Sequence, residues 1–163
     1  MKKLVLILDG ISIGKTIFTQ TLMKSNYWVW NTNHKNYLSM ITHKVGWNGE
    51  RDQNYYEFME KFDNLVNQYF DSQKQYVAEM IEKLLVSNKA EEEGKLKNIL
   101  MLGHVEIFHN LNSDVKEFIE KEYSAKSILI SDTNNSDSNY NFTLNYKNED
   151  YENQILDLIK NIL

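Results

Sequence analysis

Residues 4–16 of this chain read LVLILDGISIGKT, and this stretch decides the fold class that the sequence predicts. The apolar run Leu4–Leu8 leads into a glycine-containing turn, and a helix-compatible segment follows from Ile17. The expected order is therefore a buried strand, a loop over Gly10–Thr16 and a helix. Backbone N–H groups of such a loop, together with the N-terminus of the helix, can bind an anion such as a nucleotide polyphosphate.

The triplet Gly14-Lys15-Thr16 predicts which groups would hold that nucleotide. Lys15 would reach the β- and γ-phosphates, and the Thr16 hydroxyl would ligate Mg²⁺. In the usual pattern, G-x-x-x-x-G-K-[ST], a glycine stands where this chain has Asp9, and here the glycine follows at position 10. Either the loop is one residue shorter, or Asp9 replaces the first glycine. The alternative to a nucleotide-binding loop is an ordinary strand-turn-helix connection, in which Lys15 is a surface residue. The candidate nucleotide-binding residues are Asp9, Gly10, Ile11, Ser12, Ile13, Gly14, Lys15 and Thr16.

Composition indicates a globular protein and excludes several functions. A chain of 163 residues with 42% hydrophobic residues is most simply one domain with its own core. Because it has no cysteine, disulfides and thiolate zinc sites are excluded, and the sequence is compatible with a reducing cytoplasm. A net charge of -5 argues against a general nucleic-acid surface. No apolar run reaches membrane-helix length, and Asp9 ends the run that resembles a signal peptide, so we expect a cytoplasmic protein.

Beyond the opening stretch, short apolar runs alternate with amphipathic segments. The expected strands are 27–30, 98–103, 127–130 and 142–146, and the expected helices are 34–45, 55–70, 77–85, 113–123 and 151–162. This alternation predicts an α/β fold in three layers, with a five-stranded, mostly parallel sheet covered by helices on both faces. Ligands of such sheets lie at the carboxyl ends of the strands. The segments expected around one cleft are Gly10–Thr16, Asn31–Asn33, Gly103–Glu106 and Ser131–Asp137.

Two further segments carry a resemblance to a known family. The segment Val45–Asp52 reads VGWNGERD and is similar to a Leu-Gly-Trp-Asp-Gly-x-x-Asp stretch, and Tyr140–Leu163 forms a final strand and helix. With the Gly-Lys-Thr triplet, these segments resemble P-loop nucleoside-monophosphate kinases, most closely the phage-type deoxynucleoside-monophosphate kinase-like proteins. The resemblance covers nearly the whole chain and implies a P-loop NTPase fold. It also implies an ATP- and Mg²⁺-dependent phosphotransferase, which moves the γ-phosphoryl group to a (deoxy)nucleoside monophosphate or a similar small acceptor.

The chain departs from this family in its arginines. Members commonly carry Asp-Val-Arg after the third strand, where this chain has His104-Val105-Glu106. Kinases of this fold use several guanidinium groups, because each grips phosphate at two points, yet Arg51 is the only arginine here. Lys15 and Arg51 are therefore the candidate catalytic residues, with Arg51 on the acceptor phosphate. If lysines replace the other arginines, the candidates are Lys35, Lys44 and Lys126.

The metal ligands and the activity remain open at this stage. Glu106 could order Mg²⁺ through water in the manner of an acid at a strand end, or it could be a surface glutamate. His104 and His109 match no common zinc spacing. Trp28 is expected to belong to the core, whereas Trp30 and Trp47 could stack on a base or belong to the core. The alternative function is a degenerate P-loop protein that binds a nucleotide, or nothing, and acts through a protein partner without kinase turnover.

Overall fold

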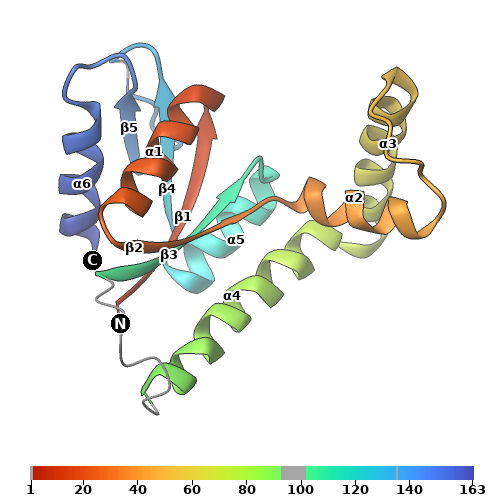
Figure 1. The fold of residues 1–163 in the computed structure, drawn as a ribbon, viewed down its shortest axis with the longest axis horizontal. Coiled ribbons are helices and arrows are strands. Elements are labelled where there is room, and N and C mark those ends of the chain that lie inside the picture. The colour runs from red at the N-terminus through yellow and green to blue at the C-terminus, as the bar shows by residue number, and fades with distance from the viewer. Residues whose placement is uncertain (1, 93–101, 135) are drawn as a thin grey trace.

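The computed structural model describes residues 2–92, 102–134 and 136–163, and strands and helices alternate along them (Figure 1). The strands are β1 (Lys3–Gly10), β2 (Tyr27–Thr32), β3 (Gly103–His109), β4 (Lys126–Ser131) and β5 (Phe142–Asn145). The helices are α1 (Ser12–Lys24), α2 (His34–Lys44), α3 (Gln53–Phe70), α4 (Ser72–Glu92), α5 (Ser113–Tyr123) and α6 (Tyr151–Ile162).

The strands form one sheet in the order β2-β3-β1-β4-β5, and every neighbouring pair is parallel. The central strand β1 and its neighbour β3 are deeply buried: Leu6, Ile7 and Leu8 of β1 have no exposed surface, and every residue of β3 is buried. Strands buried on both faces are typical of a parallel sheet, because the crossover connections put helices on each side. The α/β class and the five-stranded parallel sheet are thus confirmed for the described residues.

Two separate hydrophobic clusters show that helices cover both faces of the sheet. On one face α1 and α6 pack on β1 and β3, with Phe18 of α1 and Ile155 of α6 fully buried against Leu6. On the other face α4 and α5 pack on Ile7 and Phe108 (Figure 1). Burying one such side chain contributes about 1.5–3 kcal/mol, so these two clusters hold the three layers together.

A helical lobe made of α2, α3 and the start of α4 extends beyond the sheet on the side of β2 (Figure 1). Asn33 caps α2 by accepting from the Lys35 N–H at 2.9 Å, and Asp52 caps α3 by accepting from the Tyr55 N–H at 2.8 Å. The glycine-rich segment between the two helices breaks the helix as the sequence predicts. In α3 only Met59 is buried, so the lobe exposes much of its surface.

Several boundaries differ from those predicted, and two of the differences affect the candidate site. The predicted strand at 98–103 lies mostly outside the described residues, and β3 runs from Gly103 to His109 instead. Gly103–Glu106 therefore does not lie at a carboxyl strand end, and that prediction is wrong. Helix α1 begins at Ser12 and not at Ile17, so the predicted loop over Gly10–Thr16 is also wrong. The consequences for the candidate site are large in both cases.

Candidate phosphate-binding cleft

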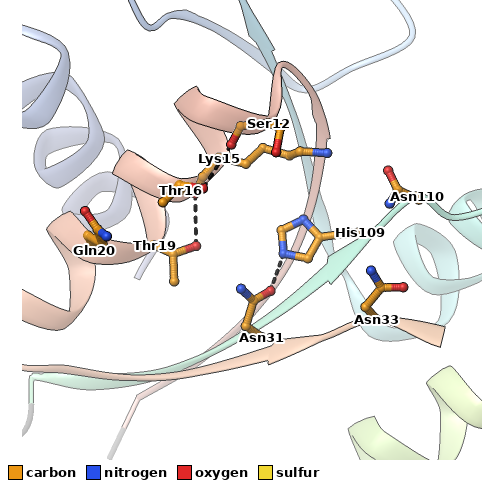
Figure 2. Close-up of a pocket in the computed structure, with 9 residues that line it drawn as sticks. All are labelled: Ser12, Lys15, Thr16, Thr19, Gln20, Asn31, Asn33, His109 and Asn110. Atoms are coloured by element: carbon orange, nitrogen blue, oxygen red, sulfur yellow. Dashed lines mark hydrogen bonds between the residues drawn. The ribbon is translucent and has the colours of Figure 1, made fainter. Parts of the chain in front are cut away.

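The carboxyl edge of the sheet opens into a cleft next to β1 and β3. These strands are neighbours, yet the helices that follow them, α1 and α5, pack on opposite faces of the sheet. In parallel sheets such a reversal creates the crevice in which ligands bind. A cavity of about 400 Å³ lies there (Figure 2). The residues that line it are Ser12, Lys15, Thr16, Thr19, Gln20, Asn31, Asn33, His109 and Asn110.

The connection from β1 to α1 is much tighter than a phosphate-binding loop. Gly10, the last residue of β1, has a φ of +89°, and Ile11 alone separates it from the first helical residue, Ser12. The Ile11 N–H donates to the Ile130 carbonyl of β4 at 2.9 Å, which fixes the turn against the sheet. Because the chain turns over one residue, there is no wide loop of N–H groups that could surround a phosphate.

The N-terminus of α1 nevertheless offers an anion site. Ile11 has no side chain that could cap the helix, and the first turn contains no acidic residue. The Lys15 N–H already donates to the Ile11 carbonyl at 3.1 Å, so the N–H groups that remain at this end are those of Ser12, Ile13 and Gly14. The helix dipole adds partial positive charge at the same place. The site therefore resembles an ordinary helix N-terminus that receives an anion.

The Gly-Lys-Thr triplet divides between the cleft and the core. Lys15 and Thr16 line the cleft, and the Thr16 hydroxyl donates to the Ser12 carbonyl at 3.1 Å. Gly14 is buried, and a Cβ at this position would lie 2.3 Å from Ile130 Cγ2 and 2.8 Å from Tyr146 Cβ. This glycine thus allows α1 to pack closely on β4 and the residue that follows β5, a role different from the predicted one.

Asp9 lies on the opposite side of β1 from the cleft. Its Oδ2 accepts a hydrogen bond from the Tyr140 hydroxyl at 3.1 Å, and burial together with Asp9 raises the pKa of Tyr140 to about 12. The carboxylate lines a different cavity, next to Lys116. Ile13 is also turned outward, with 59% of its surface exposed. Of the predicted nucleotide-binding residues, the structure therefore brings Ser12, Lys15 and Thr16 together in the cleft.

The predicted magnesium site does not fit the residues present. Glu106 lies in the middle of β3 with no exposed surface, and it accepts a hydrogen bond from Thr32 there. Burial raises its pKa to about 7, against a lowering effect of the Thr32 hydrogen bond. Among the described residues that line the cleft there is no carboxylate, whereas Mg²⁺ is usually held through one or two carboxylates besides phosphates. Thr16 remains the one predicted metal ligand in the cleft.

The strand-end residue of β3 is His109, which the sequence did not mark as part of this site. His109 Nε2 is hydrogen-bonded to Asn31 Oδ1, so a side-chain contact joins the neighbouring strands β3 and β2 where both line the cleft (Figure 2). Burial is the main effect that lowers the pKa of His109, and the Lys15 ammonium lowers it further. The signal that could have identified it is an imidazole at the end of a buried strand.

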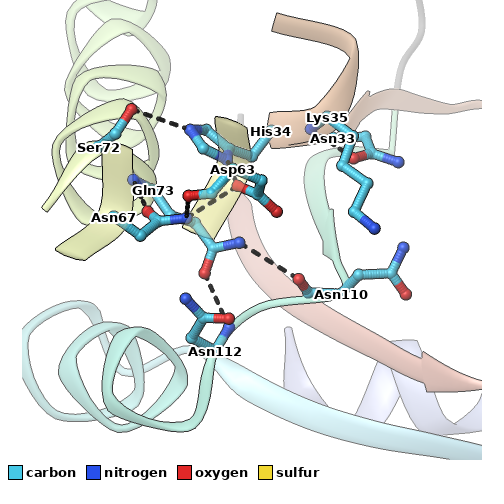
Figure 3. A network of polar contacts seen from close by, with 9 residues as sticks. All are labelled: Asn33, His34, Lys35, Asp63, Asn67, Ser72, Gln73, Asn110 and Asn112. Atoms are coloured by element: carbon cyan, nitrogen blue, oxygen red, sulfur yellow. Dashed lines mark hydrogen bonds and ion pairs between the residues drawn. The ribbon is translucent and has the colours of Figure 1, made fainter. Parts of the chain in front are cut away.

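A buried polar network attaches the helical lobe to the cleft (Figure 3). His34, at the start of α2, contacts Asp63 of α3 at 3.2 Å and Ser72 of α4 at 3.1 Å. Gln73 donates to the Asn110 carbonyl at 3.3 Å and accepts from the Asn112 N–H at 2.7 Å. Since Asn110 lines the cleft, the buried Gln73 holds one wall of the cleft against the lobe.

Arg51 lies in the lobe and not in the cleft. It lines a second cavity of about 400 Å³, which we call the lobe pocket. The start of α2 joins the two sites, because Asn33 lines the cleft and Lys35 lines the lobe pocket. The other candidate lysines, Lys44 and Lys126, line neither of them. The residues of the lobe pocket are Lys35, Asn36, Ser39, Arg51, Tyr55, Tyr56, Met59 and Glu60.

The remaining candidates pack among themselves. His104 stacks on Trp28 with ring centroids 5.4 Å apart and forms a T-shaped pair with Trp30, with centroids 4.7 Å apart. Because His109 is five positions after His104 in one strand, an odd offset, their side chains point to opposite faces and cannot share a metal. Trp47 stacks on Tyr55 at 4.2 Å, outside the cleft. None of the three tryptophans lines the cleft.

Comparison of the chain with protein-family models, with curated proteins and with solved structures gives no match. The fold and the cleft therefore define a class only: an α/β protein with a parallel sheet and a cleft at its carboxyl edge. Within the described residues, no helix is both long enough and apolar enough to cross a membrane. Nor do those residues contain a group of three or more histidines and carboxylates that could hold a metal ion.

Proposed function

We propose that this protein binds a nucleoside phosphate, with the phosphates in the cleft at the N-terminus of α1, and that it acts through this binding. The observation that carries the proposal is the position of Lys15, whose side chain lines the cleft beside the uncapped start of α1. An ammonium group and free helix N–H groups together are a favourable environment for phosphate. The amide side chains of Asn31, Asn33 and Asn110 supply further polar contacts.

The absence of a carboxylate from the described lining favours binding over phosphoryl transfer. Transfer depends on neutralising the charge of the moving phosphoryl group, for which kinases use metal ions and arginines. In this structure the only arginine lies in the lobe pocket, and Glu106 is held inside the sheet. A nucleotide-binding protein that acts through a protein partner, and that holds phosphate at a helix N-terminus and not in a wide P-loop, is consistent with these positions. We also propose a cytoplasmic location, where nucleotides are abundant.

Lys15→Ala tests the binding site. We expect ADP or ATP to raise the melting temperature of the wild-type protein, since a ligand at 100 times its Kd stabilises the native state by about 2.7 kcal/mol. Lys15→Ala removes a charge-assisted contact worth about 1.5–3 kcal/mol, so the affinity should fall about 10- to 100-fold. The control is Lys24→Ala, which removes the same charge from the last turn of α1. An equal shift in all three proteins would remove Lys15 from the site.

Phosphoryl transfer remains a second candidate because the lobe pocket adjoins the cleft. Lys35 and Arg51 could hold the phosphate of an acceptor there, and Tyr55 and Tyr56 could contact its base. With a donor nucleotide beside Lys15, the two ligands would meet near the start of α2. This arrangement is that of the kinase which the sequence predicts, with ATP as donor and a nucleoside monophosphate as acceptor.

Arg51→Lys separates the two candidates. If transfer occurs, ATP with one of the common nucleoside or deoxynucleoside monophosphates should release ADP. Arg51→Lys should then lower the rate about 10- to 100-fold, because an ammonium cannot make the two-point guanidinium contact. Binding of ATP alone should be unchanged, and Lys44→Ala, outside both pockets, should behave as the wild type. ADP release that survives Arg51→Lys would contradict the acceptor assignment, and the lack of release with any acceptor would leave binding as the function.

A further inference from the structure

His109 is the one titratable side chain besides Lys15 among the described residues that line the cleft. It is the last residue of β3 and pairs with Leu8 of β1, and only 9% of its surface is exposed. Figure 2 shows the ring between the side chains of Lys15 and Asn31. His109 lies at the carboxyl end of β3. The sequence predicts an acid, Glu106, at the end of this strand as a ligand of Mg²⁺. An imidazole stands there instead.

The two ring nitrogens of His109 have different surroundings. Nε2 is hydrogen-bonded to Asn31 Oδ1, and since a carbonyl oxygen only accepts, Nε2 carries the hydrogen of the neutral ring. Nδ1 is buried and has no hydrogen-bond partner of normal geometry among the described residues. The nearby Leu8 carbonyl favours a protonated ring. A proton can therefore be added at Nδ1 without breaking the contact with Asn31.

The charges that act on the His109 ring determine the pH at which this proton is added. Burial and the Lys15 ammonium of α1 lower the pKa of His109, while the Leu8 carbonyl and the Asp9 carboxylate of β1 raise it. The partner from β2, Asn31, is neutral. A bound phosphate beside Lys15 would offset the ammonium charge and add negative charge near the ring, which favours the imidazolium form.

We propose that phosphate binding in this cleft is coupled to the uptake of a proton by His109, which supplies positive charge in place of a divalent cation. The inference rests on the proposed function, because it describes how the same cleft compensates the charge of its ligand. A di- or triphosphate brings more than one negative charge, and the described lining offers Lys15 as its permanent cation. The cleft therefore selects the metal-free form of the nucleotide, and it binds more tightly at lower pH.

Calorimetry with ADP and EDTA tests the coupling. Titrations at one pH, in two buffers with different enthalpies of ionisation, give the number of protons taken up. We expect the wild-type protein to take up more protons than His109→Gln, with a difference approaching about one proton per ADP. On acidification from pH 8 to pH 6, the wild-type affinity should rise up to about tenfold per pH unit more than that of the variant. The matched control is His43→Gln, an exposed histidine of α2 outside the cleft.

A second measurement uses the wild-type protein alone, so it does not require that His109→Gln folds. The pKa of the His109 ring, followed by NMR in the wild-type protein, should rise when ADP is added, and an unchanged pKa would overturn the inference. Equal proton uptake in the wild type and His109→Gln would overturn it too, as would binding that occurs with Mg²⁺ and is lost in EDTA. In those cases the proposed function survives. If ADP does not bind with or without Mg²⁺, both proposals fail.

Discussion

Gly10→Ala is expected to lower the free energy of unfolding by about 4 kcal/mol. The alanine would have to adopt a φ of +89°, and its Cβ would lie 2.0 Å from the Ile130 backbone oxygen. The unfavourable backbone conformation costs about 1–3 kcal/mol. The overlap adds about 1–3 kcal/mol, because Ile130 belongs to a strand paired with β1 and cannot move freely. Gly10 is thus the residue that sets where α1 begins.

Gly46→Ala provides the matched control for this prediction. Gly46 also has a positive φ, of +104°, but a Cβ there would meet nothing within 4 Å. It should therefore show only the conformational cost, about 1–3 kcal/mol. Urea unfolding of both variants measures the difference. Equal losses for the two glycines would mean that the close approach of Gly10 to β4 does not determine the tight turn.

Glu106→Gln is expected to be more stable than the wild-type protein by about 3 kcal/mol at pH 8, and equally stable near pH 4.5. Burial raises the pKa of Glu106 from 4.5 to about 7, so the folded protein holds a proton that the unfolded chain releases. For the wild type, this stabilisation is complete below pH 4.5 and is lost as the pH rises through 7. Glutamine keeps the shape of the neutral acid and does not titrate, so the variant does not lose this stability as the pH rises.

His104, on the same face of the sheet as Glu106, has the opposite effect on the pH dependence of stability. Burial, and then the Lys3 charge, lower the pKa of His104 from 6.5 to about 4, so its stabilisation is lost as the pH falls through 6.5 towards 4. Between about pH 4.5 and 6.5 the two side chains are neutral in the folded protein and charged in the unfolded chain. Unfolding then moves one proton from the carboxyl to the imidazole with no net release. Their contributions to the pH dependence cancel in this range.

Because the contributions of Glu106 and His104 cancel in the wild type, removing one of them should reveal the pH dependence of the other. Glu106→Gln should lose about 3 kcal/mol between pH 6.5 and 4 through His104, beyond any loss of the wild type. Glu82→Gln, an exposed glutamate of α4, is the control and should follow the wild type throughout. Chemical unfolding measured across this pH range gives both curves. Parallel curves for the wild type and Glu106→Gln would contradict the burial of a neutral acid at this position.

The sequence predicted the fold well because the signals for it are local. Alternating apolar and amphipathic segments indicated the parallel sheet, and the predicted helix at 113–123 coincides with α5. The extent of β3 was missed because His104 and Glu106 interrupt its apolar pattern, while a more continuous apolar run precedes it. Both polar side chains are tolerated inside the sheet because they are held neutral against Trp28, Trp30 and Thr32. Only the tertiary structure supplies these partners.

The candidate site was predicted only in part, because some of its residues are placed by local sequence and others by tertiary contacts. Lys15 lines the cleft as expected, since its position depends on the first strand and helix alone. The helical start at Ser12 was missed because glycine disfavours a helix, and the packing of Gly14 on Ile130 overrides this preference. The contact between Asn31 and His109 joins residues far apart in the chain, and it depends on the register of β2 against β3. No local pattern could indicate it.

The amide resonances of Ser12, Ile13 and Gly14 provide the most direct test of the central claim, which is that the N-terminus of α1 receives phosphate. These residues carry the N–H groups that remain free at the start of the helix. In an NMR titration with ADP, we predict that their amide shifts change most, together with those of neighbouring Lys15, and that Lys15→Ala weakens the response. Shifts confined to residues around Arg51, or no shifts at the start of α1, would contradict the account.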